Sequence, residues 1–281
     1  MISSGNDTQR ESGCTDHGVR IMGILNVTPD SFSDGGRFFS EQEVIDQVER
    51  LIAEGADIID VGGESSRPGA AAVSLGEELR RVLPTIQAIR QRYAIPISVD
   101  TTKGEVARQA IAAGANIVND ISGLRFDPEM VEVVRETGVH TVVMHMQGSP
   151  RTMQENPAYG DVVREIRCFL RDRTDWAVAA GIKREQLIID PGIGFGKTVS
   201  HNLSILKHLA EFRSLGYPLL IGHSRKAFLG KILGLSTDER DLATAVLSAH
   251  CAAHGVAILR VHDVAKTRQA TRLMDALTTA P

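Results

Sequence analysis

The sequence predicts a closed barrel of eight parallel strands, each followed by a helix, which is the (β/α)8 or TIM-barrel fold. Three observations lead to this prediction: short apolar runs alternate with segments of helical spacing, the runs are apolar at consecutive positions, and eight of them fit within the 281 residues. Runs that are apolar on both faces indicate a parallel sheet covered by helices. Eight such runs over about 250 residues are typical of a barrel.

The predicted strands follow one another with helix-length gaps. They cover residues 19–25, 57–62, 95–99, 116–119, 140–144, 187–190, 218–222 and 256–261. An open, doubly wound sheet is the alternative fold. The pattern G-x-G-x-x-G, which a dinucleotide-binding sheet of that kind carries after its first strand, is absent here, and this favours the barrel.

Amphipathic helices are expected between the strands, because apolar residues there recur three or four positions apart. Several of these segments end in glycine, the usual residue just past a helix C-terminus. The clearest segments are 43–55, 76–93, 104–114, 128–138 and 241–255.

The composition is that of a globular protein, with 42% hydrophobic and 23% charged residues and a formal net charge of −4. These values exclude the disordered and membrane classes, and no basic stripe indicates nucleic acid. Residues 1–18 are polar, without periodicity or the apolar stretch of a secretory signal. We therefore expect a flexible N-terminal tail, a single barrel domain over residues 19–278, a cytoplasmic location, and neither a nucleic acid nor a membrane as partner.

The segment 187–197, LIIDPGIGFGK, is the clearest candidate for a site. Asp190 ends an apolar strand that Pro191 and Gly192 cannot continue. A buried carboxylate needs hydrogen-bond donors, and the glycines after it allow a ligand to approach closely. A structural Asp that caps its own loop is the alternative. Polar residues at the other strand ends favour a site, because active sites of barrels lie at the carboxyl ends of the strands.

One group of strand-end residues is suited to binding a flat polar heterocycle. A carboxylate accepts two parallel N–H groups at once, an apolar floor supports the ring, and a guanidinium stacks on its face. We assign the polar contacts to Asp100, Asn119, Asp190 and Lys226, the floor to Met144, and the stacking cation to Arg260. Taken singly, Met144 has the alternative of being an ordinary core residue.

A second group favours an anion, most simply a phosphate. It comprises Asn26, Arg67, His262 and Ser224, the last placed by the sequence at the N-terminus of a helix. Asn26 offers one oxygen to a magnesium ion that the phosphates would mostly hold. Arg67 has the alternative of a solvated loop charge, and His262, like His145, that of a hydrogen-bonded structural group.

Seven motifs resemble those of the dihydropteroate synthases of folate biosynthesis. They are ILNVTPDSFSDGG, GGESSRPGA, SVDTTK, VNDISG, DPGIGFGK, SRKAFLG and RVHDV, in the family's order from Val19 to Leu277. The resemblance implies condensation of 6-hydroxymethyl-7,8-dihydropterin diphosphate with p-aminobenzoate to give 7,8-dihydropteroate and pyrophosphate. It also implies magnesium as cofactor, a homodimer, and sulfonamides that compete with p-aminobenzoate.

Carried over residue by residue, the resemblance assigns four overlapping sets. The pterin set is Asp100, Asn119, Met144, Asp190, Lys226 and Arg260. The diphosphate set is Asn26, Ser66, Arg67, Arg260 and His262, with Asn26 also the metal ligand. The p-aminobenzoate set is Phe32, Ser66, Arg67, Pro68, Phe195, Lys226 and Ala227. The catalytic set is Asp34, Arg67, Asp100, Asp190 and Lys226.

Two positions depart from the family pattern. Ser66 stands where the family usually has Thr, and Ala227 stands where many members have Ser. Because a hydroxyl near the aminobenzoate carboxylate is missing at Ala227, we expect activity with an altered aminobenzoate affinity. The loops 27–40 and 63–75 are longer than usual and rich in Gly, Ser and Pro, which suits lids over the site.

The expected mechanism is a dissociative displacement in which pyrophosphate leaves before the amine bonds. Two alternatives stay open on the sequence. One is a methyltetrahydrofolate-binding methyltransferase domain, which needs a corrinoid partner and does not carry the SFSDGG loop. The other is a paralogue that binds pterins without catalysis.

Overall fold

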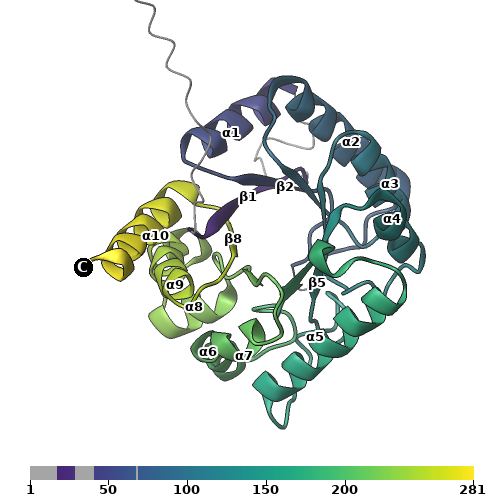
Figure 1. Cartoon of the computed structure of the whole chain (residues 1–281). Helices are drawn as coiled ribbons and strands as arrows, with labels where there is room; N and C mark the ends of the chain where they lie inside the picture. The colour runs from purple at the N-terminus through teal and green to yellow at the C-terminus, as the bar shows by residue number, and fades with distance from the viewer. Residues whose placement is uncertain (1–17, 29–40, 68) are drawn as a thin grey trace, which may run out of the picture.

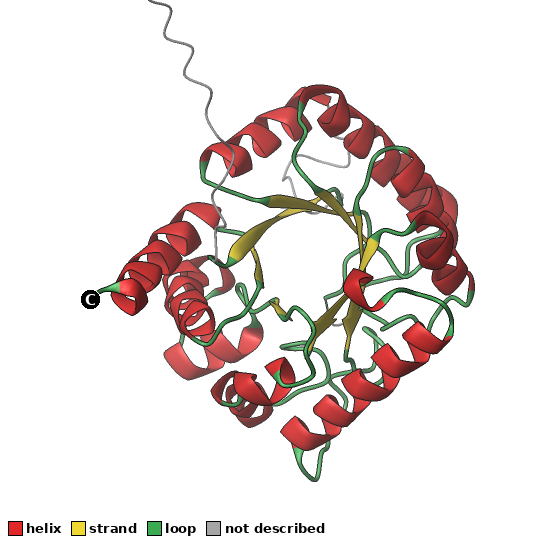
Figure 2. Ribbon diagram, viewed as in Figure 1, coloured by secondary structure: helices red, strands yellow, loops and turns green. Residues whose placement is uncertain are grey.

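The computed structural model describes residues 18–28, 41–67 and 69–281, and these form the predicted barrel (Figures 1 and 2). The strands lie in one sheet in the order β6-β5-β4-β3-β2-β1-β8-β7, and all neighbours are parallel. A single parallel bridge between Ile189 and Leu219 joins the two ends of the sheet. The helices surround the strands as an outer layer.

The strands begin and end close to the predicted positions. They are β1 (Arg20–Asn26), β2 (Ile58–Gly62), β3 (Ile97–Asp100), β4 (Ile117–Asp120), β5 (His140–Met144), β6 (Leu187–Asp190), β7 (Leu220–Ile221) and β8 (Ile258–Val261). β7 is shorter than predicted. Pro218 precedes it and has no N–H for a sheet ladder, although its carbonyl oxygen accepts the Ile189 N–H at 3.0 Å.

Helices follow the strands as predicted. They are α1 (Glu41–Ala53), α2 (Leu75–Arg92), α3 (Gly104–Ala112), α4 (Glu129–Thr137), α5 (Val162–Ala179), α6 (Val199–Lys207), α7 (Leu209–Arg213), α8 (Ala227–Leu233), α9 (Asp241–Ala253) and α10 (Val264–Thr279), with 3-10 turns at Arg184–Gln186 and Thr237–Arg240. Gly138, just past α4, has a φ of 72°, as a left-handed helix end requires.

The core has two parts, one on each face of the sheet. Seven strands each place one side chain in a cluster inside the barrel, formed by Met22, Ile58, Ile117, Val142, Ile188, Leu220 and Ile258. The alternate residues of the strands point outward into a larger cluster shared with the helices. Full burial of one such side chain stabilises the fold by about 1.5–3 kcal/mol. The inner cluster fills the barrel below the polar strand ends.

Two predictions fall partly or wholly outside the described residues. The expected flexible tail is described only from Gly18 onward, and loop 27–40 only at its first two residues. Within the described ranges, every helix is too short or too polar to cross a membrane.

Candidate active site

The polar strand ends gather at one end of the barrel, as predicted. Asn26, Asp100 and Asp190 are the last residues of β1, β3 and β6, and Met144 is the last residue of β5. Asn119 precedes the last residue of β4 and pairs in register with Asp100. Because side chains alternate along a strand, Asn119 and its neighbour Asp120 point to opposite faces.

Asp120 has a structural task. Its carboxylate accepts the N–H groups of Ser122 and Leu124 at 2.7 and 2.9 Å. Burial raises its pKa to about 6, against these hydrogen bonds, which lower it. Asn119 is 3% exposed and makes no side-chain hydrogen bond within the described residues, so its amide is available to a ligand.

Arg260 of β8 joins two carboxylates inside the barrel. Its Nε lies 2.6 Å from Asp60 Oδ2, and its Nη2 lies 2.6 Å from Asp100 Oδ2. Burial alone would lower the pKa of Arg260, but the two carboxylates hold it above its ordinary value. Burial raises the pKa of Asp100 to about 7; Arg260 lowers it, and Asp60 adds to the rise. The guanidinium is therefore a fixed cation.

Sequence reasoning missed Asp60. Its side chain is fully buried, and Oδ1 has no hydrogen-bond partner within the described residues. A charged residue in the run IIDVG, two positions before the strand end, was the available signal. A carboxylate in a strand buried on both faces needs a cation, and the only cationic side chain within 4 Å of it in the described residues is Arg260.

The loop after β6 follows the predicted pattern. Asp190 Oδ1 accepts the Gly192 N–H at 2.7 Å, and Gly192, Gly194 and Gly196 have φ values of 71°, 82° and 63°. Burial raises the pKa of Asp190 to about 6, while the Gly192 N–H and Lys226 lower it. A Cβ on Gly194 would lie 2.9 Å from Lys226 Cδ, so only glycine leaves room for the lysine.

Lys226 and Phe195 form one wall of the site. Lys226 Nζ lies 4.1 Å from the centre of the Phe195 ring, a cation–π distance. Burial and the nearby Arg260 lower the pKa of Lys226 to about 8, against the carboxylates of Asp190 and Asp100. The ring packs in a small apolar cluster composed of Ile121, Met144, Met146, Met153 and Phe195. This cluster places Met144 as an apolar floor beside the carboxylates.

His262 is held by Ser224. The Ser224 hydroxyl lies 2.9 Å from His262 Nδ1 and accepts the His262 backbone N–H at 3.1 Å. Ser224 was expected at a helix N-terminus, and this expectation was wrong, because α8 begins at Ala227. Burial, followed by the charges of Arg225 and Arg260, lowers the pKa of His262 to about 3, so its imidazole is neutral.

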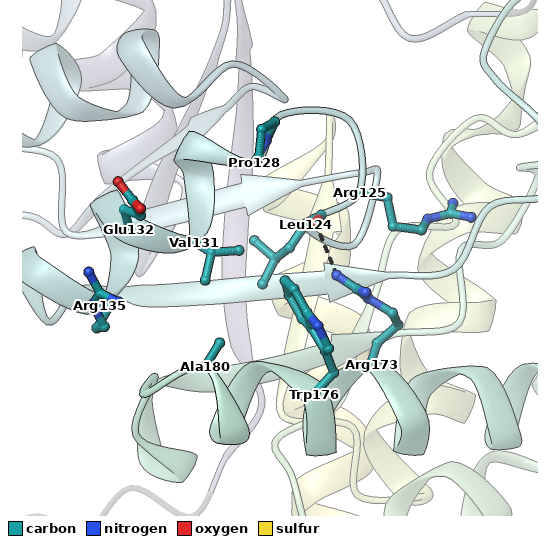
Figure 3. Close-up of a pocket in the computed structure, with 9 residues that line it drawn as sticks. All are labelled: Leu124, Arg125, Pro128, Val131, Glu132, Arg135, Arg173, Trp176 and Ala180. Carbon is teal, nitrogen blue, oxygen red and sulfur yellow. Dashed lines mark hydrogen bonds between the residues drawn. The ribbon is translucent and has the colours of Figure 1, made fainter.

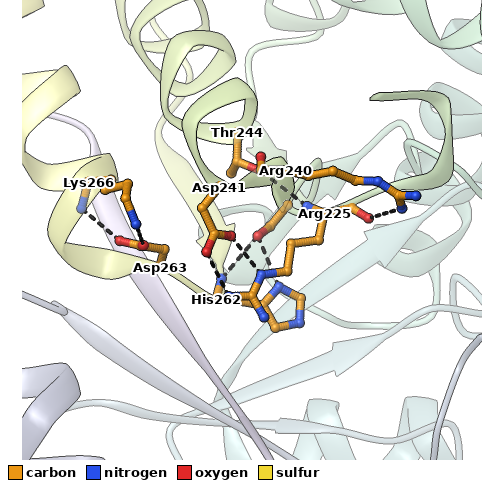
Figure 4. A network of polar contacts seen from close by, with 8 residues as sticks. Arg225, Arg240, Asp241, Thr244, His262, Asp263 and Lys266 are labelled. Atoms are coloured by element: carbon orange, nitrogen blue, oxygen red, sulfur yellow. Dashed lines mark hydrogen bonds and ion pairs between the residues drawn. The ribbon is translucent and has the colours of Figure 1, made fainter. Parts of the chain in front are cut away.

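An ion pair fixes the segment that carries Ser224 and Lys226. Arg225 lies between them with a φ of 54°, which non-glycine residues rarely adopt. Its guanidinium donates to both oxygens of Asp241 at 2.6 and 2.8 Å, and Arg240 donates to its carbonyl oxygen at 3.1 Å (Figure 4). These contacts hold the strained backbone in place.

Asn26 fits a magnesium ion held mainly by phosphates. The described residues contain no group of three or more His, Cys, Asp or Glu placed to bind a metal. A Cβ on Gly62 would lie 3.5 Å from Asn26 Oδ1 and 3.6 Å from Asp100 Cβ, so the glycine keeps the space around the amide open. An amide oxygen suits magnesium, which commonly takes one or two protein oxygens alongside phosphate and water.

The loop after β2 is anchored at its first two residues, Gly63 and Glu64. Lys103 binds Glu64 and Glu78 at 2.5 Å each, and Arg81 donates to the Gly63 carbonyl oxygen at 2.9 Å. Arg67 is exposed and forms no ion pair within the described part of the chain. Within the described ranges, no hydrogen bond links the Arg67 side chain to another residue.

Of the remaining predicted residues, two lie within the described part of the chain and three lie outside it. Ser66 is half-buried beside Arg67, and Ala227 is exposed at the first position of α8. Phe32, Asp34 and Pro68 lie outside the described residues.

A surface groove lies apart from this site, between α4 and α5 (Figure 3). Its floor is apolar, and Arg173 stacks on Trp176 with its guanidinium carbon 3.9 Å from the ring centre. The lining residues are Leu124, Arg125, Pro128, Val131, Glu132, Arg135, Arg173, Trp176 and Ala180. They include none of the predicted site residues.

The family model described as "Pterin binding enzyme" matches residues 22–262. A relative from Synechocystis, a dihydropteroate synthase, is 50% identical over 258 residues, which are 92% of this chain and 89% of the relative.

Two solved structures of the Xanthomonas albilineans dihydropteroate synthase superpose closely on this chain. The structure with 4-aminobenzoic acid has a TM-score of 0.88 at 44% identity and covers 94% of each chain. The structure in complex with 7,8-dihydropteroate has a TM-score of 0.85 at 41% identity and covers 94% of this chain and 95% of the other.

Proposed function

Because this chain belongs to the pterin-binding enzymes and, among them, to the dihydropteroate synthases, transferases of folate biosynthesis, we propose which molecules it joins and how. The substrates are 6-hydroxymethyl-7,8-dihydropterin diphosphate and p-aminobenzoate, and the products are 7,8-dihydropteroate and pyrophosphate. The observation that carries this proposal is the meeting of Asp100, Asp190, Lys226 and Arg260 above an apolar floor. Carboxylates beside a flat floor suit a heterocycle with paired N–H groups.

The pterin ring lies between the strand ends in this proposal. Asp190 and Asn119 form hydrogen bonds with its polar edge, Met144 supports one face of the ring, and Arg260 covers the other face. Asp190 has one carboxylate oxygen bound to the Gly192 N–H, which leaves the other available for a ring N–H. The Asp60 pairing supports the role of Arg260, because it holds the guanidinium in one orientation.

The diphosphate and p-aminobenzoate occupy the mouth of the site. Neutral His262, Arg260 and, once its loop closes, Arg67 donate to the diphosphate. The aminobenzoate ring lies against Phe195 and Lys226, with its carboxylate toward Ser66 and the first residues of α8. A relative solved with 4-aminobenzoic acid supports this substrate.

We propose a dissociative displacement at the exocyclic methylene of the pterin. The bond between that carbon and the diphosphate oxygen breaks first, and its electron pair leaves with pyrophosphate. The aminobenzoate nitrogen then bonds to the methylene and loses a proton. Fixed carboxylates of Asp100 and Asp190 stabilise the cationic transition state more than the neutral ring, and no protein nucleophile is required.

Magnesium, with Asn26 as its protein ligand, would supply positive charge to the leaving diphosphate. The chain's own residues orient the reaction. Arg260 donates to the leaving oxygens while Lys226 and Phe195 hold the amine in line with the methylene.

A pyrophosphate-release assay tests this function. Purified protein receives magnesium and the dihydropterin diphosphate, with and without p-aminobenzoate. Pyrophosphate release coupled to dihydropteroate formation is the expected result. Tight pterin binding without product at high aminobenzoate would instead identify a non-catalytic pterin-binding protein.

A homodimer is part of the proposal. Apolar side chains on α9 and α10 are strongly exposed, with Leu242 at 70%, Val246 at 61%, Leu273 at 65% and Leu277 at 63%. α9 and α10 pack against each other on the outside of the barrel, so these residues can form an apolar face for a second copy (Figure 1). The cytoplasmic location stays a prediction from composition.

A further inference from the structure

We propose that Lys197 is a positioning residue for the aminobenzoate side of the site. Its buried ammonium fastens the glycine-rich loop 191–196 to the end of β5 and so fixes the Phe195 ring. This inference rests on the proposed function, because it concerns how that site receives its second substrate.

Lys197 makes three contacts from a buried position. It is 3% exposed, and its Nζ lies 2.8 Å from the Phe195 carbonyl oxygen, 3.1 Å from His145 Nδ1 and 3.4 Å from the His145 carbonyl oxygen. An ammonium has three N–H groups, so each contact takes one donor. His145 accepts because its imidazole is neutral: burial, followed by the charge of Lys197, lowers its pKa to about 2.

The absence of an ion pair argues against a role in stability alone. Within the described residues no carboxylate lies within 4.0 Å of the Lys197 ammonium, and burial lowers its pKa to about 7 against the more distant charge of Asp190, so keeping this cation buried is costly. A methionine, unbranched and only one heavy atom shorter, would fill most of the space without that cost. The lysine is therefore explained by what its three donors hold together, which is the loop after β6 and the chain after β5.

The loop lies directly on the chain after β5. A Cβ on Gly192 would collide with the His145 carbonyl oxygen, and one on Gly196 would lie 2.8 Å from Gln147 Cβ. Only glycine allows this approach, and it brings the loop carbonyls within reach of Lys197. The lysine then holds the contact from inside.

Phe195 transmits this constraint to the site. Its carbonyl oxygen is bound by Lys197, while its ring carries Lys226 Nζ at 4.1 Å and packs in the apolar cluster with Met144. A shift of the Phe195 backbone therefore moves the wall on which the aminobenzoate rests. Asp190 keeps its own hydrogen bond to the Gly192 N–H, so the geometry of the pterin contacts depends less on Lys197, although the Lys197 charge also lowers the Asp190 pKa.

Two substitutions on the same loop contact test the inference. Lys197→Met removes the three donors and keeps an unbranched side chain that is one heavy atom shorter. Tyr159→Phe is the control, because it removes the 2.8 Å hydrogen bond from Tyr159 to the Gly196 carbonyl oxygen, one residue beyond Phe195. Both variants lose contacts to this loop, but only the first releases the Phe195 carbonyl.

We expect the KM for p-aminobenzoate to rise about tenfold or more in Lys197→Met, since small misplacements of binding groups cost factors of this size. At pH 8, where Asp190 stays ionised with or without the Lys197 charge, the Kd of a pterin should change less than about threefold, and Tyr159→Phe should change either constant less than about twofold. An unchanged aminobenzoate KM in Lys197→Met would overturn the inference. So would equal rises for both substrates in both variants, which indicate general loosening.

Hydrogen exchange of the ligand-free protein separates this inference from the proposed function. The amides of Gly194 and Phe195 donate within the loop region at 2.7 and 3.1 Å, and they should exchange faster in Lys197→Met. Wild-type protein that forms no dihydropteroate would refute the proposed function. The exchange comparison would then still show whether Lys197 holds the loop, and unchanged exchange would refute that.

If Lys197→Met does not fold, two substitutions of His145 test the same contact from the other side. His145→Asn keeps a side-chain acceptor near the position of Nδ1, whereas His145→Leu removes it. The leucine variant should raise the aminobenzoate KM severalfold and the asparagine variant should not. Equal constants in these two variants would contradict the role of the Lys197 contacts.

Discussion

Replacing Asp60 by Asn tests how the site keeps Arg260 in place. The variant keeps the shape of the side chain but removes the negative charge 2.6 Å from Arg260 Nε. An amide oxygen still accepts the hydrogen bond, and Asp100 still binds Nη2, so the guanidinium does not lose all its partners. The expected effect is therefore smaller than the roughly 3–5 kcal/mol lost when a buried ion pair is broken outright.

The magnitude follows from the kinds of bond involved. A charge-assisted hydrogen bond contributes about 1.5–3 kcal/mol and is roughly twice as strong as a neutral one. Exchanging one for the other at Asp60, which is fully buried, should lower the free energy of unfolding by about 1–2 kcal/mol. Urea unfolding of the two proteins measures this difference directly.

The pH dependence gives a sharper test. The charge of Asp60 helps to raise the pKa of Asp100 to about 7, so Asp60→Asn should bring this pKa down. A pterin that needs ionised Asp100 would then keep its affinity to lower pH in the variant. The raised pKa of Asp100 also affects stability. The carboxyl group ionises with a pKa of 3.8 in the unfolded chain but of about 7 in the folded protein, so the free energy of unfolding falls as pH rises between these two values.

Calorimetric titration of a pterin between pH 5 and 8 reads this shift. Asp57→Asn is the matched control, since Asp57 directly precedes β2 at the amino end of the strand, pairs with Arg268 and is 38% exposed. It should leave the pH midpoint of binding unchanged. Identical midpoints in wild type and Asp60→Asn would refute the reasoning about Arg260 and Asp100.

Three other substitutions give separable outcomes. Asp190→Asn should weaken pterin binding and also lower kcat, and a change in KM alone would contradict the electrostatic role. A pKa of about 6 for Asp190 implies that wild-type pterin affinity falls about tenfold from pH 7 to pH 5, and this pH dependence should be absent in the variant. Ala227→Ser supplies the hydroxyl that this chain lacks at the start of α8 and should lower the aminobenzoate KM severalfold, whereas equal constants would count against a carboxylate site there. Lys103→Met leaves Glu64 and the fully buried Glu78 without their cation, so thermal unfolding should show a loss of about 3 kcal/mol. An unchanged midpoint would contradict the role of this cation in the fold.

The strand ends were predictable because a barrel brings the carboxyl ends of all its strands to one face. A residue such as Asp190 needed only the end of an apolar run and the proline after it to be placed. Met144 and Asn119 were placed by the same rule. Periodicity thus placed these side chains at one end of the barrel without any knowledge of contacts.

The contacts between elements were not predictable in this way. Asp60 stands inside an apolar run, and its partner Arg260 is 200 residues away, so the pair exists only after the barrel closes. Glu78 reads as an exposed helix residue, yet it is buried because the first turn of α2 packs against Lys103. Lys197 looked like the end of a glycine loop, and its burial depends on the chain after β5.

The closure of the barrel gives the ligand a mechanical role. β6 and β7 are joined by one bridge, and β7 has only two residues, so this junction is the weakest line in the wall. Asp190 stands on one side of it and Lys226 on the other. A molecule that binds both side chains ties the two edges together, so amide protons along this junction should exchange more slowly in the complex, and the barrel should resist opening there as a single ring.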